Sequence, residues 1–379
     1  MINTLEFYNH LIKNNITFFS GVPDSLLKDF CACVYDNSKG NSHIIASNEG
    51  ASIGLGVGHY LATKNIPFIY MQNSGFGNSI NPILSIADDL VYGIPMIIMM
   101  GWRGEPNMSD EPQHIRQGMV NEKMLQSMDI PYVVVDENSS INVINLAIKT
   151  SKKISKPFVL LVKKNTFSKY QLINKDIASY ELNREEAIKL IINSLDETDV
   201  VVSTTGKASR EVFEYRKALN QGHEKDFLTV GAMGHASSIA IGIALKTPNK
   251  NIYCIDGDGS VIMHMGTLAV NGSLNNLNNF KHIIINNGAH DSVGGQPTVG
   301  FEIDFVSIAK ACGYTFSNSA ETKKEIIKKL KILSEHKGIG LLEIKVNKGA
   351  REGLGRPTNS PLDNKNLFQK FLLNEKKIS

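Results

Sequence analysis

The segment from Asn251 to Ala289 constrains the fold of this chain more than any other. Its first apolar run, which ends at Asp256, is typical of a buried strand and leads directly into Gly257-Asp258-Gly259-Ser260. A helical stretch follows, and a second apolar run from His282 to Ile285 ends in Asn286-Asn287-Gly288. A helix that joins two parallel strands brings their carboxyl ends side by side. Both polar clusters are therefore expected at one edge of a sheet.

That sheet edge offers the oxygen ligands that a hard cation requires. The carboxylate of Asp258, the side-chain amide of Asn287 and nearby backbone carbonyls are expected around one point. Mg²⁺ suits such a site, because it binds through one or two carboxylates and shares its other positions with phosphates and water. An ordinary βαβ unit with glycine and asparagine turns is the structural alternative. Dinucleotide binding is another alternative, but no Gly-x-Gly-x-x-Gly opens a helix here.

The Gly-Asp-Gly-Ser and Asn-Asn-Gly pair resembles the signature of thiamine diphosphate-dependent enzymes. The resemblance implies that Mg²⁺ binds to Asp258, Asn287 and the backbone carbonyl of Ala289, and that the metal holds the diphosphate of the cofactor. It also implies that the cofactor contacts Gly257, Gly259 and Ser260.

A cofactor with a diphosphate end and a ring end needs a second contact, and the amino-terminal half of the chain holds a candidate acid. Residues His43 to Ala46 are expected to form a short strand, after which Glu49 opens a helix of small residues. A carboxylate at a helix amino terminus is stabilised by the helix dipole, so a capping role is the structural alternative. By the resemblance, Glu49 binds the pyrimidine nitrogen N1′ and so promotes formation of the reactive ylide.

The segment from Val230 to Ala244 is expected to start a helix just before the metal strand. By the resemblance, its Gly231 contacts the cofactor, and its Met233 matches the bulky apolar residue that holds the cofactor bent beneath the thiazolium ring. Core filling is the alternative for Met233, since methionine packs adaptably.

A second half of the diphosphate site is expected upstream, where Ser203 to Glu211 follows a strand. Thr205 and Gly206 offer backbone N–H groups to phosphate oxygens at the start of a helix. A capped helix with Lys207 on the surface is the alternative.

Strands and helices alternate in two rounds along the chain, and the strands are mostly continuous apolar runs. This pattern predicts an α/β protein with two doubly wound parallel sheets. We expect a pyrimidine-binding domain (1–165), a linker (166–182) and a diphosphate-binding domain (183–379), with no central third domain. The expected strands lie near residues 17–20, 43–46, 67–71, 95–100, 131–135, 158–162, 200–203, 251–255, 282–285 and 341–346.

Composition agrees with an enzyme of the cytoplasm. The 379 residues carry a net charge of +3, which gives no reason to expect nucleic acid as a partner. The 4 cysteines are scattered without a Cys-x-x-Cys pair or zinc spacing, so a reducing compartment is expected. No apolar run approaches the ~18 residues of a membrane helix, so no membrane is expected either.

Four further segments narrow the family. They are Gly21–Ser25, Gly101–Pro106, Asp110–Gly118 and Gly349–Thr358. Together they resemble phosphonopyruvate decarboxylases, and the match covers essentially the whole chain. The resemblance implies thiamine diphosphate- and Mg²⁺-dependent decarboxylation of 3-phosphonopyruvate to phosphonoacetaldehyde in phosphonate biosynthesis. It also implies a homodimer or larger homo-oligomer with active sites between subunits.

Two other functions stay open. Sulfopyruvate decarboxylases share the same layout, sometimes as two chains. A thiamine-dependent transferase or an oxidoreductase component belongs to a different class, which predicts ferredoxin-type cysteine clusters or a docking surface for a lipoyl domain. The chain carries no such cysteine cluster.

Decarboxylation needs groups that carry a proton near neutral pH, which favours histidine or a carboxyl group with a raised pKa. Asp24 directly follows the first strand, and His114 is expected in a loop before a helix that starts after Gly118. His235 and His290 flank the cofactor segments and are secondary candidates. Helix capping is the alternative for Asp24, and a structural loop contact is the alternative for His114.

The two oxyanions of the substrate require cations, and the planar guanidinium of arginine matches them in two-point geometry. Arg103, Arg351 and Arg356 lie in glycine-rich loops, and the latter two are the preferred phosphonate contacts. A surface ion pair is the alternative for each of the three.

Overall fold

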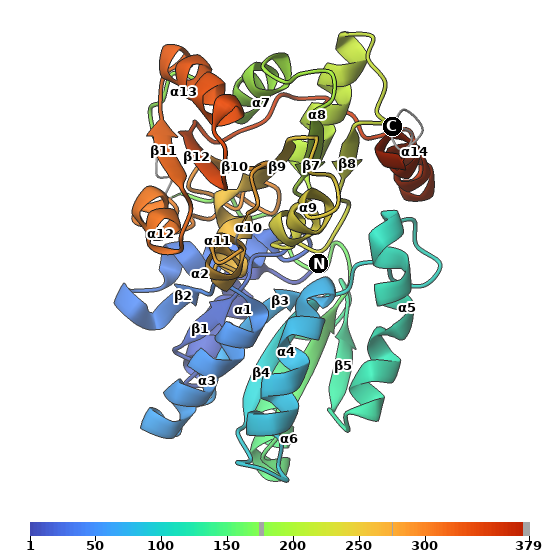
Figure 1. Ribbon diagram of the computed structural model, residues 1–379. Helices are drawn as coiled ribbons and strands as arrows, with labels where there is room; N and C mark the ends of the chain where they lie inside the picture. The colour runs from blue at the N-terminus through green and yellow to red at the C-terminus, as the bar shows by residue number, and fades with distance from the viewer. Residues whose placement is uncertain (174–177, 275, 374–379) are drawn as a thin grey trace. The chain divides into compact units, whose positions relative to one another are not determined.

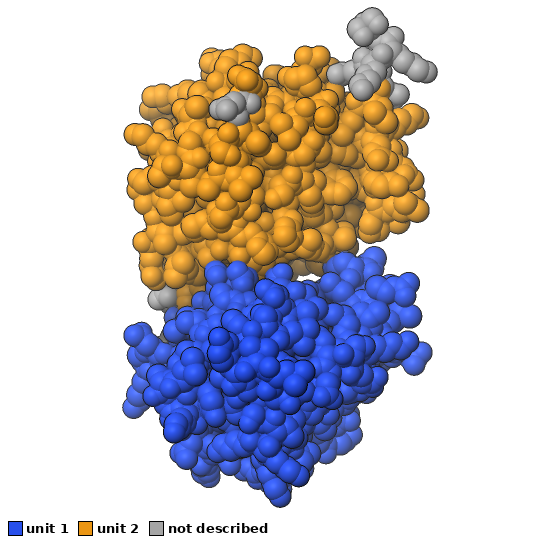
Figure 2. All heavy atoms as spheres, turned by 60° about the horizontal axis from the view of Figure 1, so that its bottom comes forward, with its two compact units in different colours: residues 1–175, 292–296 blue, residues 176–291, 297–379 orange. Residues whose placement is uncertain are grey.

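The computed structural model describes residues 1–173, 178–274 and 276–373 (Figure 1). The chain forms two compact units, coloured separately in Figure 2. One unit contains Met1–Lys175 and Ser292–Gln296, and the other contains Asp176–Asp291 and Pro297–Ser379. Within the described ranges, no helix combines the length and the apolar character needed to cross a membrane.

The first unit alternates short strands with helices. Its strands are β1 (Phe19–Gly21), β2 (His43–Ile45), β3 (Phe68–Gln72), β4 (Met96–Gly101), β5 (Tyr132–Val135) and β6 (Pro157–Val162). Its α-helices are α1 (Thr4–Lys13), α2 (Lys28–Asn37), α3 (Glu49–Thr63), α4 (Phe76–Pro82), α5 (Pro112–Ser127) and α6 (Val143–Ile154).

The second unit repeats this alternation. Its strands are β7 (Val200–Ser203), β8 (Asp226–Leu228), β9 (Ile252–Gly257), β10 (Phe280–Asn286), β11 (Phe316–Ala320) and β12 (Gly340–Lys345). Its α-helices are α7 (Arg184–Asn193), α8 (Lys207–Ala218), α9 (Ala236–Ala244), α10 (Asp258–Met263), α11 (Gly266–Gly272), α12 (Phe305–Ala311), α13 (Lys323–Glu335) and α14 (Pro361–Leu373).

The two sheets have the same topology. In the part of the chain that the structure describes, each contains 6 strands, in the orders β2-β1-β3-β4-β6-β5 and β8-β7-β9-β10-β12-β11, and every pairing is parallel. The strand order reverses between β1 and β3 in the first sheet and between β7 and β9 in the second. Ligands of open α/β sheets bind at the carboxyl ends of the strands beside such a reversal. The expected fold, two doubly wound parallel sheets without a central domain between them, is confirmed in the described ranges.

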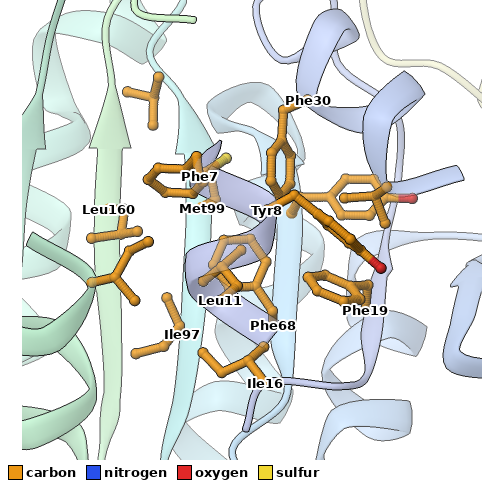
Figure 3. Close-up of a cluster of buried hydrophobic side chains, with 14 of the residues drawn as sticks. Phe7, Tyr8, Leu11, Ile16, Phe19, Phe30, Phe68, Ile97, Met99 and Leu160 are labelled. Carbon is orange, nitrogen blue, oxygen red and sulfur yellow. The ribbon is translucent and has the colours of Figure 1, made fainter. Parts of the chain in front are cut away.

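The apolar strands form the centre of each unit because both of their faces are covered. In the first unit, all six residues of β4 are buried, and so are all six of β6. Helices α1, α2 and α6 pack on one face, where aromatic rings from α1, α2, β1 and β3 meet (Figure 3). Helices α3, α4 and α5 cover the other face.

The second sheet is enclosed in the same way. Helices α7, α8 and α13 contribute apolar residues to the core on one face, and helices α9 to α12 and α14 contribute to the core on the other. Both faces of β9 and β10 are therefore shielded from water, and the packed strands hold the polar residues at their carboxyl ends in place.

Two strands of the second sheet were not expected from the sequence. β8 has only 3 residues, and its first residue is a buried aspartate. β11 is the polar run Phe-Ser-Asn-Ser-Ala at the edge of the sheet, and most of it is half-exposed. Both segments are strands because β8 pairs with β7 and β11 pairs with β12, and not because their sequences show an apolar pattern.

The expected linker, 166–182, spans the boundary between the two units. Its first part belongs to the first unit. There Phe167 pairs with Ile2 in an isolated parallel β-bridge, and the Thr4 backbone N–H donates to the Ser168 hydroxyl at 3.1 Å. Residues 174–177 lie outside the described residues.

Candidate active site

Asp258 lies where β9 ends and α10 begins, and it is the carboxylate of the expected metal site. Its side chain is 2 % exposed. One carboxylate oxygen accepts the Asn287 backbone N–H at 3.4 Å, and the other accepts the hydroxyl of Thr298. Burial raises the pKa of Asp258 to about 6, and the hydroxyl of Thr298 acts in the opposite direction.

The two neighbouring asparagines at the end of β10 do different things. Asn286 donates its amide to the backbone carbonyl of Gly300 and to the carboxylate of Glu343 on β12, both at 2.7 Å. Asn287 turns the chain instead, because its side-chain oxygen accepts the Ala289 N–H at 3.2 Å. Asn286 therefore secures the loop over the site, and Asn287 with Ala289 lines the site beside Asp258.

Gly300 explains how closely this loop approaches the carboxylate. A Cβ atom at Gly300 would lie 2.6 Å from an Asp258 carboxylate oxygen and 2.7 Å from the Asn286 side-chain oxygen. A side chain at this position would therefore displace both polar groups.

Ser260 connects the three segments of this unit that were expected to contact the cofactor. Its hydroxyl lies 3.0 Å from the Thr204 hydroxyl at the end of β7 and accepts the Gly234 N–H at 3.0 Å. The carboxyl ends of β7 and β9 and the loop before α9 therefore meet at the point where the strand order reverses.

Thr205 and Gly206 lie at the amino terminus of α8. Gly206 caps the helix with φ +92°, and no side chain caps the first N–H groups. Lys207 is half-buried rather than a surface residue, because its ammonium donates to the backbone carbonyl of Asp291 at 3.0 Å. A helix start without a capping side chain presents N–H donors and a positive dipole to an anion.

Gly231 and Met233 lie in the loop between β8 and α9, and the side chain of Met233 is half-buried. The chain bends sharply here, since Ala232 has φ +54° and Gly234 has φ +84°. His235 is exposed and stacks on His264 with 4.5 Å between ring centroids. Burial lowers the pKa of His290 to about 4, which leaves it a poor proton carrier near neutral pH.

The residues of this unit fit a bound Mg²⁺ and a diphosphate. Among the described residues, no lysine, arginine or histidine forms an ion pair with Asp258, although its carboxylate is buried. A buried carboxylate without a partner is costly, and a cation at this point would compensate for it. Hard oxygen donors are what Mg²⁺ requires, and the free start of α8 suits phosphate oxygens.

In the first unit, Glu49 opens α3 but does not cap it. The cap is Asn48, whose side-chain oxygen accepts the Ala51 N–H at 2.9 Å. Glu49 is 5 % exposed, and one of its carboxylate oxygens accepts the side-chain amide of Asn78 on α4 at 2.8 Å. Burial raises the pKa of Glu49, and the hydrogen bond from Asn78 acts in the opposite direction.

Asp24 is fully buried after β1, at the strand-order reversal of the first sheet. Gln72, the last residue of β3, donates its amide to the Asp24 carboxylate at 2.5 Å. The other carboxylate oxygen of Asp24 has no hydrogen-bond partner among the described residues. It faces Gly101 at the end of β4, where a Cβ atom would lie 1.8 Å away. Burial raises the pKa of Asp24, so its carboxyl group can hold a proton at higher pH than an exposed aspartate.

Arg103 is tied to Asp110 rather than free. Its guanidinium forms a two-point contact with the Asp110 carboxylate, including an Nε–Oδ2 hydrogen bond of 2.8 Å, and donates to the Ser25 hydroxyl at 2.9 Å. The positive charge of Arg103 influences both Asp24 and His114. The structure thus brings these three predicted residues into one polar group.

The prediction that His114 lies in a loop is wrong. Helix α5 begins at Pro112, so His114 lies in its first turn and is buried. Proline suits this position because its missing N–H has no partner in the first turn anyway. Burial lowers the pKa of His114, the nearby charge of Arg103 adds to this, and the ring lies 3.2 Å from the side chain of Gln117.

The tail arginines lie in the second unit. Arg351 contacts the carboxylate of Glu185 at 3.1 Å and also pairs with Glu214, which accepts the Gly355 N–H at 2.8 Å. The exposed Arg356 has a partner of its own. The structure thus places Arg351 in an ion-pair cluster.

Sequence reasoning missed several polar residues that hold the site residues in place. They are Gln72, Asn78, Asp110 and Thr298. Each acts across elements that are distant in the sequence or across a loop. Only Gln72 had a detectable signal, because it is the polar residue that ends an apolar strand.

Two family models match the two halves of this chain. Residues 7–129 match the model described as "Thiamine pyrophosphate enzyme, N-terminal TPP binding domain", and residues 204–344 match the corresponding C-terminal TPP binding domain. The phosphonopyruvate decarboxylase of Streptomyces viridochromogenes is 28 % identical over 98 % of this chain and 95 % of its own length.

Sulfopyruvate decarboxylases are also similar. The enzyme of Methanosarcina acetivorans is 25 % identical over 85 % of this chain and 86 % of its own length. The sulfopyruvate decarboxylase subunit beta of Methanocaldococcus jannaschii is 36 % identical over 41 % of this chain and 79 % of its own length.

Proposed function

The chain belongs to the thiamine pyrophosphate enzyme family, and we propose that it is a decarboxylase that converts 3-phosphonopyruvate to phosphonoacetaldehyde and carbon dioxide. The observation that carries the substrate is the similarity to a phosphonopyruvate decarboxylase along 98 % of the chain. In this proposal the enzyme uses thiamine diphosphate and Mg²⁺, acts in phosphonate biosynthesis, and is a cytoplasmic homo-oligomer.

The second unit would bind the diphosphate end of the cofactor. Asp258, Asn287 and the carbonyl of Ala289 would hold Mg²⁺, in line with the buried carboxylate that has no cationic partner among the described residues. The N–H groups at the start of α8, behind Thr205 and Gly206, would receive phosphate oxygens. The remaining diphosphate contacts would come from Gly257, Gly259 and Ser260. Gly231 and Met233 would lie against the rest of the cofactor.

The first unit would bind the pyrimidine end through Glu49. Asn78 donates to one oxygen of this carboxylate, which leaves the other oxygen for a ring nitrogen. A carboxyl group with a raised pKa can share a proton at that nitrogen near neutral pH. When bound, thiamine diphosphate supplies the electron sink that decarboxylation requires, and the protein supplies orientation and proton control.

Asp24 and His114 are the proposed proton carriers. The raised pKa of the Asp24 carboxyl group suits proton donation, and Gln72 orients it through one oxygen. The lowered pKa of His114 keeps its imidazole neutral, so it can accept or donate a hydrogen bond without carrying a charge.

Arg103, Arg351 and Arg356 are the proposed substrate contacts, and the structure sets a condition for two of them. Arg351 would have to leave Glu185 and Glu214 in order to bind a phosphonate. Arg103 would act from its position on Asp110, which keeps its guanidinium beside Asp24.

Sulfopyruvate decarboxylation is the second candidate, because relatives with that name match both as a single chain and as a separate subunit. Phosphonate and sulfonate are both tetrahedral oxyanions that differ mainly in charge. The pocket chemistry described above suits either.

The test is carbon dioxide release by the purified protein with thiamine diphosphate and Mg²⁺. It compares 3-phosphonopyruvate, 3-sulfopyruvate and pyruvate side by side, with the Glu49→Gln variant as the control. Preference for phosphonopyruvate that disappears without the cofactor supports the proposal. Preference for sulfopyruvate contradicts the substrate but leaves the cofactor chemistry in place, and no release from any of the three contradicts the decarboxylase itself.

A further inference from the structure

Three potential metal ligands meet in the core of the second unit, on the face of the sheet covered by α9 to α12. Cys254 and Asp256 lie two residues apart on β9, so their side chains point to the same face of the sheet. His282 on β10 is the direct cross-strand partner of Cys254. One ligand atom from each of the three lies within 4.8 Å of the others, and all three side chains are buried.

The side chains of His282 and Asp256 lie close together but form no hydrogen bond with each other. The imidazole Nε2 lies 3.6 Å from the Asp256 carboxylate, which is too far for a hydrogen bond. Nε2 has no hydrogen-bond partner among the described residues, although the His282 side chain is only 1 % exposed. The other ring nitrogen, Nδ1, lies 3.5 Å from the hydroxyl of Tyr314. Nε2 and the carboxylate oxygen thus face each other in the core without a hydrogen bond between them, an arrangement that a shared cation would satisfy.

We propose that Cys254, Asp256 and His282 form a binding site for Zn²⁺. Tetrahedral zinc binds nitrogen and oxygen at ~2.0–2.2 Å, which separates two such ligands by about 3.3–3.6 Å. The observed separation of 3.6 Å between Nε2 and the carboxylate oxygen therefore matches two ligands on one ion. The thiolate and the carboxylate together carry two negative charges, so the site with zinc is neutral overall. A neutral site is the kind that a dry core tolerates.

The ligand set distinguishes this site from that of Mg²⁺. A thiolate and an imidazole select zinc or a similar transition metal, whereas Asp258 and Asn287 offer only the hard oxygens that Mg²⁺ prefers. Cys254 would bind zinc as its thiolate, so binding of the metal releases a proton. The hydroxyl of Tyr314 lies 3.5 Å from Nδ1 of His282, the ring nitrogen that would not bind the metal. Metal-binding histidines usually have a polar partner at this second nitrogen.

The zinc would join β9 to β10 just below their carboxyl ends. These are the strands whose ends carry Asp258 and Asn287, so the ion would hold the two sides of the proposed cofactor site in register. The proposal does not depend on the substrate or on the cofactor. Because the ligands are buried, the metal is expected to enter as the chain folds.

The experiment measures metal in the full-length protein, without substrate or thiamine diphosphate. The protein is purified without chelators from zinc-supplemented cells, and its zinc is determined by plasma emission spectrometry. A second sample is unfolded with a chelator and refolded with Co²⁺, since a cobalt–thiolate bond gives a near-ultraviolet charge-transfer band. Cys254→Ser and His282→Gln remove ligands, and Cys33→Ser removes a buried thiol of the first unit as the matched control.

One zinc per chain and a cobalt–thiolate band are expected, with both lost in Cys254→Ser and retained in Cys33→Ser. Asp258→Ala should keep the zinc, which distinguishes this site from the proposed Mg²⁺ site. Zinc no higher in the wild type than in Cys254→Ser, together with no cobalt–thiolate band, overturns the proposal. Zinc that is lost in Asp258→Ala but kept in Cys254→Ser also overturns it. If the ligand variants do not fold, the zinc content and cobalt spectrum of the wild type decide the question alone.

Discussion

Replacing Gly75 with alanine tests whether the position of the Glu49 carboxylate controls the reaction. A Cβ atom at Gly75 would lie 1.9 Å from one carboxylate oxygen of Glu49 and 2.2 Å from its carboxyl carbon. The backbone of Gly75 is in the ordinary right-handed helical region, with φ −86°, so alanine fits the local conformation. The substitution therefore acts through this contact alone.

The size of the effect follows from the geometry. Real Cβ atoms essentially never approach another heavy atom closer than 3.0 Å, so the carboxylate must retreat by more than 1 Å. Misplacement of a catalytic group by ~1 Å lowers turnover on the order of 10²-fold. Overpacking at a buried position also destabilises the fold by ~1–3 kcal/mol.

Gly77→Ala is the matched control, because a Cβ atom at Gly77 meets nothing within 4 Å and the residue lies in α4. Alanine in place of glycine within a helix is expected to stabilise the protein by ~0.5–1 kcal/mol and to leave turnover unchanged. Carbon dioxide release at saturating thiamine diphosphate measures the first effect, and urea unfolding measures the second. Gly75→Ala with turnover close to that of Gly77→Ala would refute the role given to Glu49.

Four further outcomes are expected. Glu49→Gln keeps cofactor binding, measured by calorimetry, but loses most turnover; near-normal turnover would contradict its part in activating the cofactor. Asp258→Ala abolishes Mg²⁺-dependent retention of the cofactor in equilibrium dialysis, and unchanged affinity would remove Asp258 from the metal site. Arg351→Ala raises the KM for phosphonopyruvate more than it lowers kcat, whereas an unchanged KM would leave Arg351 only its ion pairs with Glu185 and Glu214. Burial lowers the pKa of His43 from 6.5 to about 4. Between these two pH values the unfolded chain binds more protons than the folded chain, so the free energy of unfolding falls as the pH falls. His43→Gln should flatten this part of the pH profile of urea unfolding, and an unchanged profile would contradict the direction of the pKa shift.

The common strand order of the two sheets explains why the polar residues of both units lie at equivalent places. Asp24 and Thr204 each follow the strand on one side of the reversal, and Gln72 and Asp258 each lie at the end of the strand on the other side. A side-chain contact joins the two sides in each unit: Gln72 to Asp24 in the first, and Ser260 to Thr204 in the second. The same architecture thus positions a buried carboxylate beside the strand-order reversal in each unit.

Sequence reasoning succeeded where the signal is local. Apolar strand runs and the polar residues directly after them predicted the two sheets, the family and the place of Glu49 at the start of α3. It failed for β8 and β11, whose sequences are short or polar, and for His114, which a proline-initiated helix removes from a loop. The roles of the site residues remain predictions that the proposed variants test.

By itself, the sequence determined which residues stand at strand ends, because alternating apolar runs and glycine-rich turns are properties of neighbouring residues. Only the tertiary structure decided which side chains from separate elements meet. Asn78 reaches Glu49 from another helix, and His282 reaches Asp256 from another strand. No spacing of cysteines indicated the proposed zinc site, because a site built across two strands depends on the register between them. That register is set by the packing of both sheet faces against their helices.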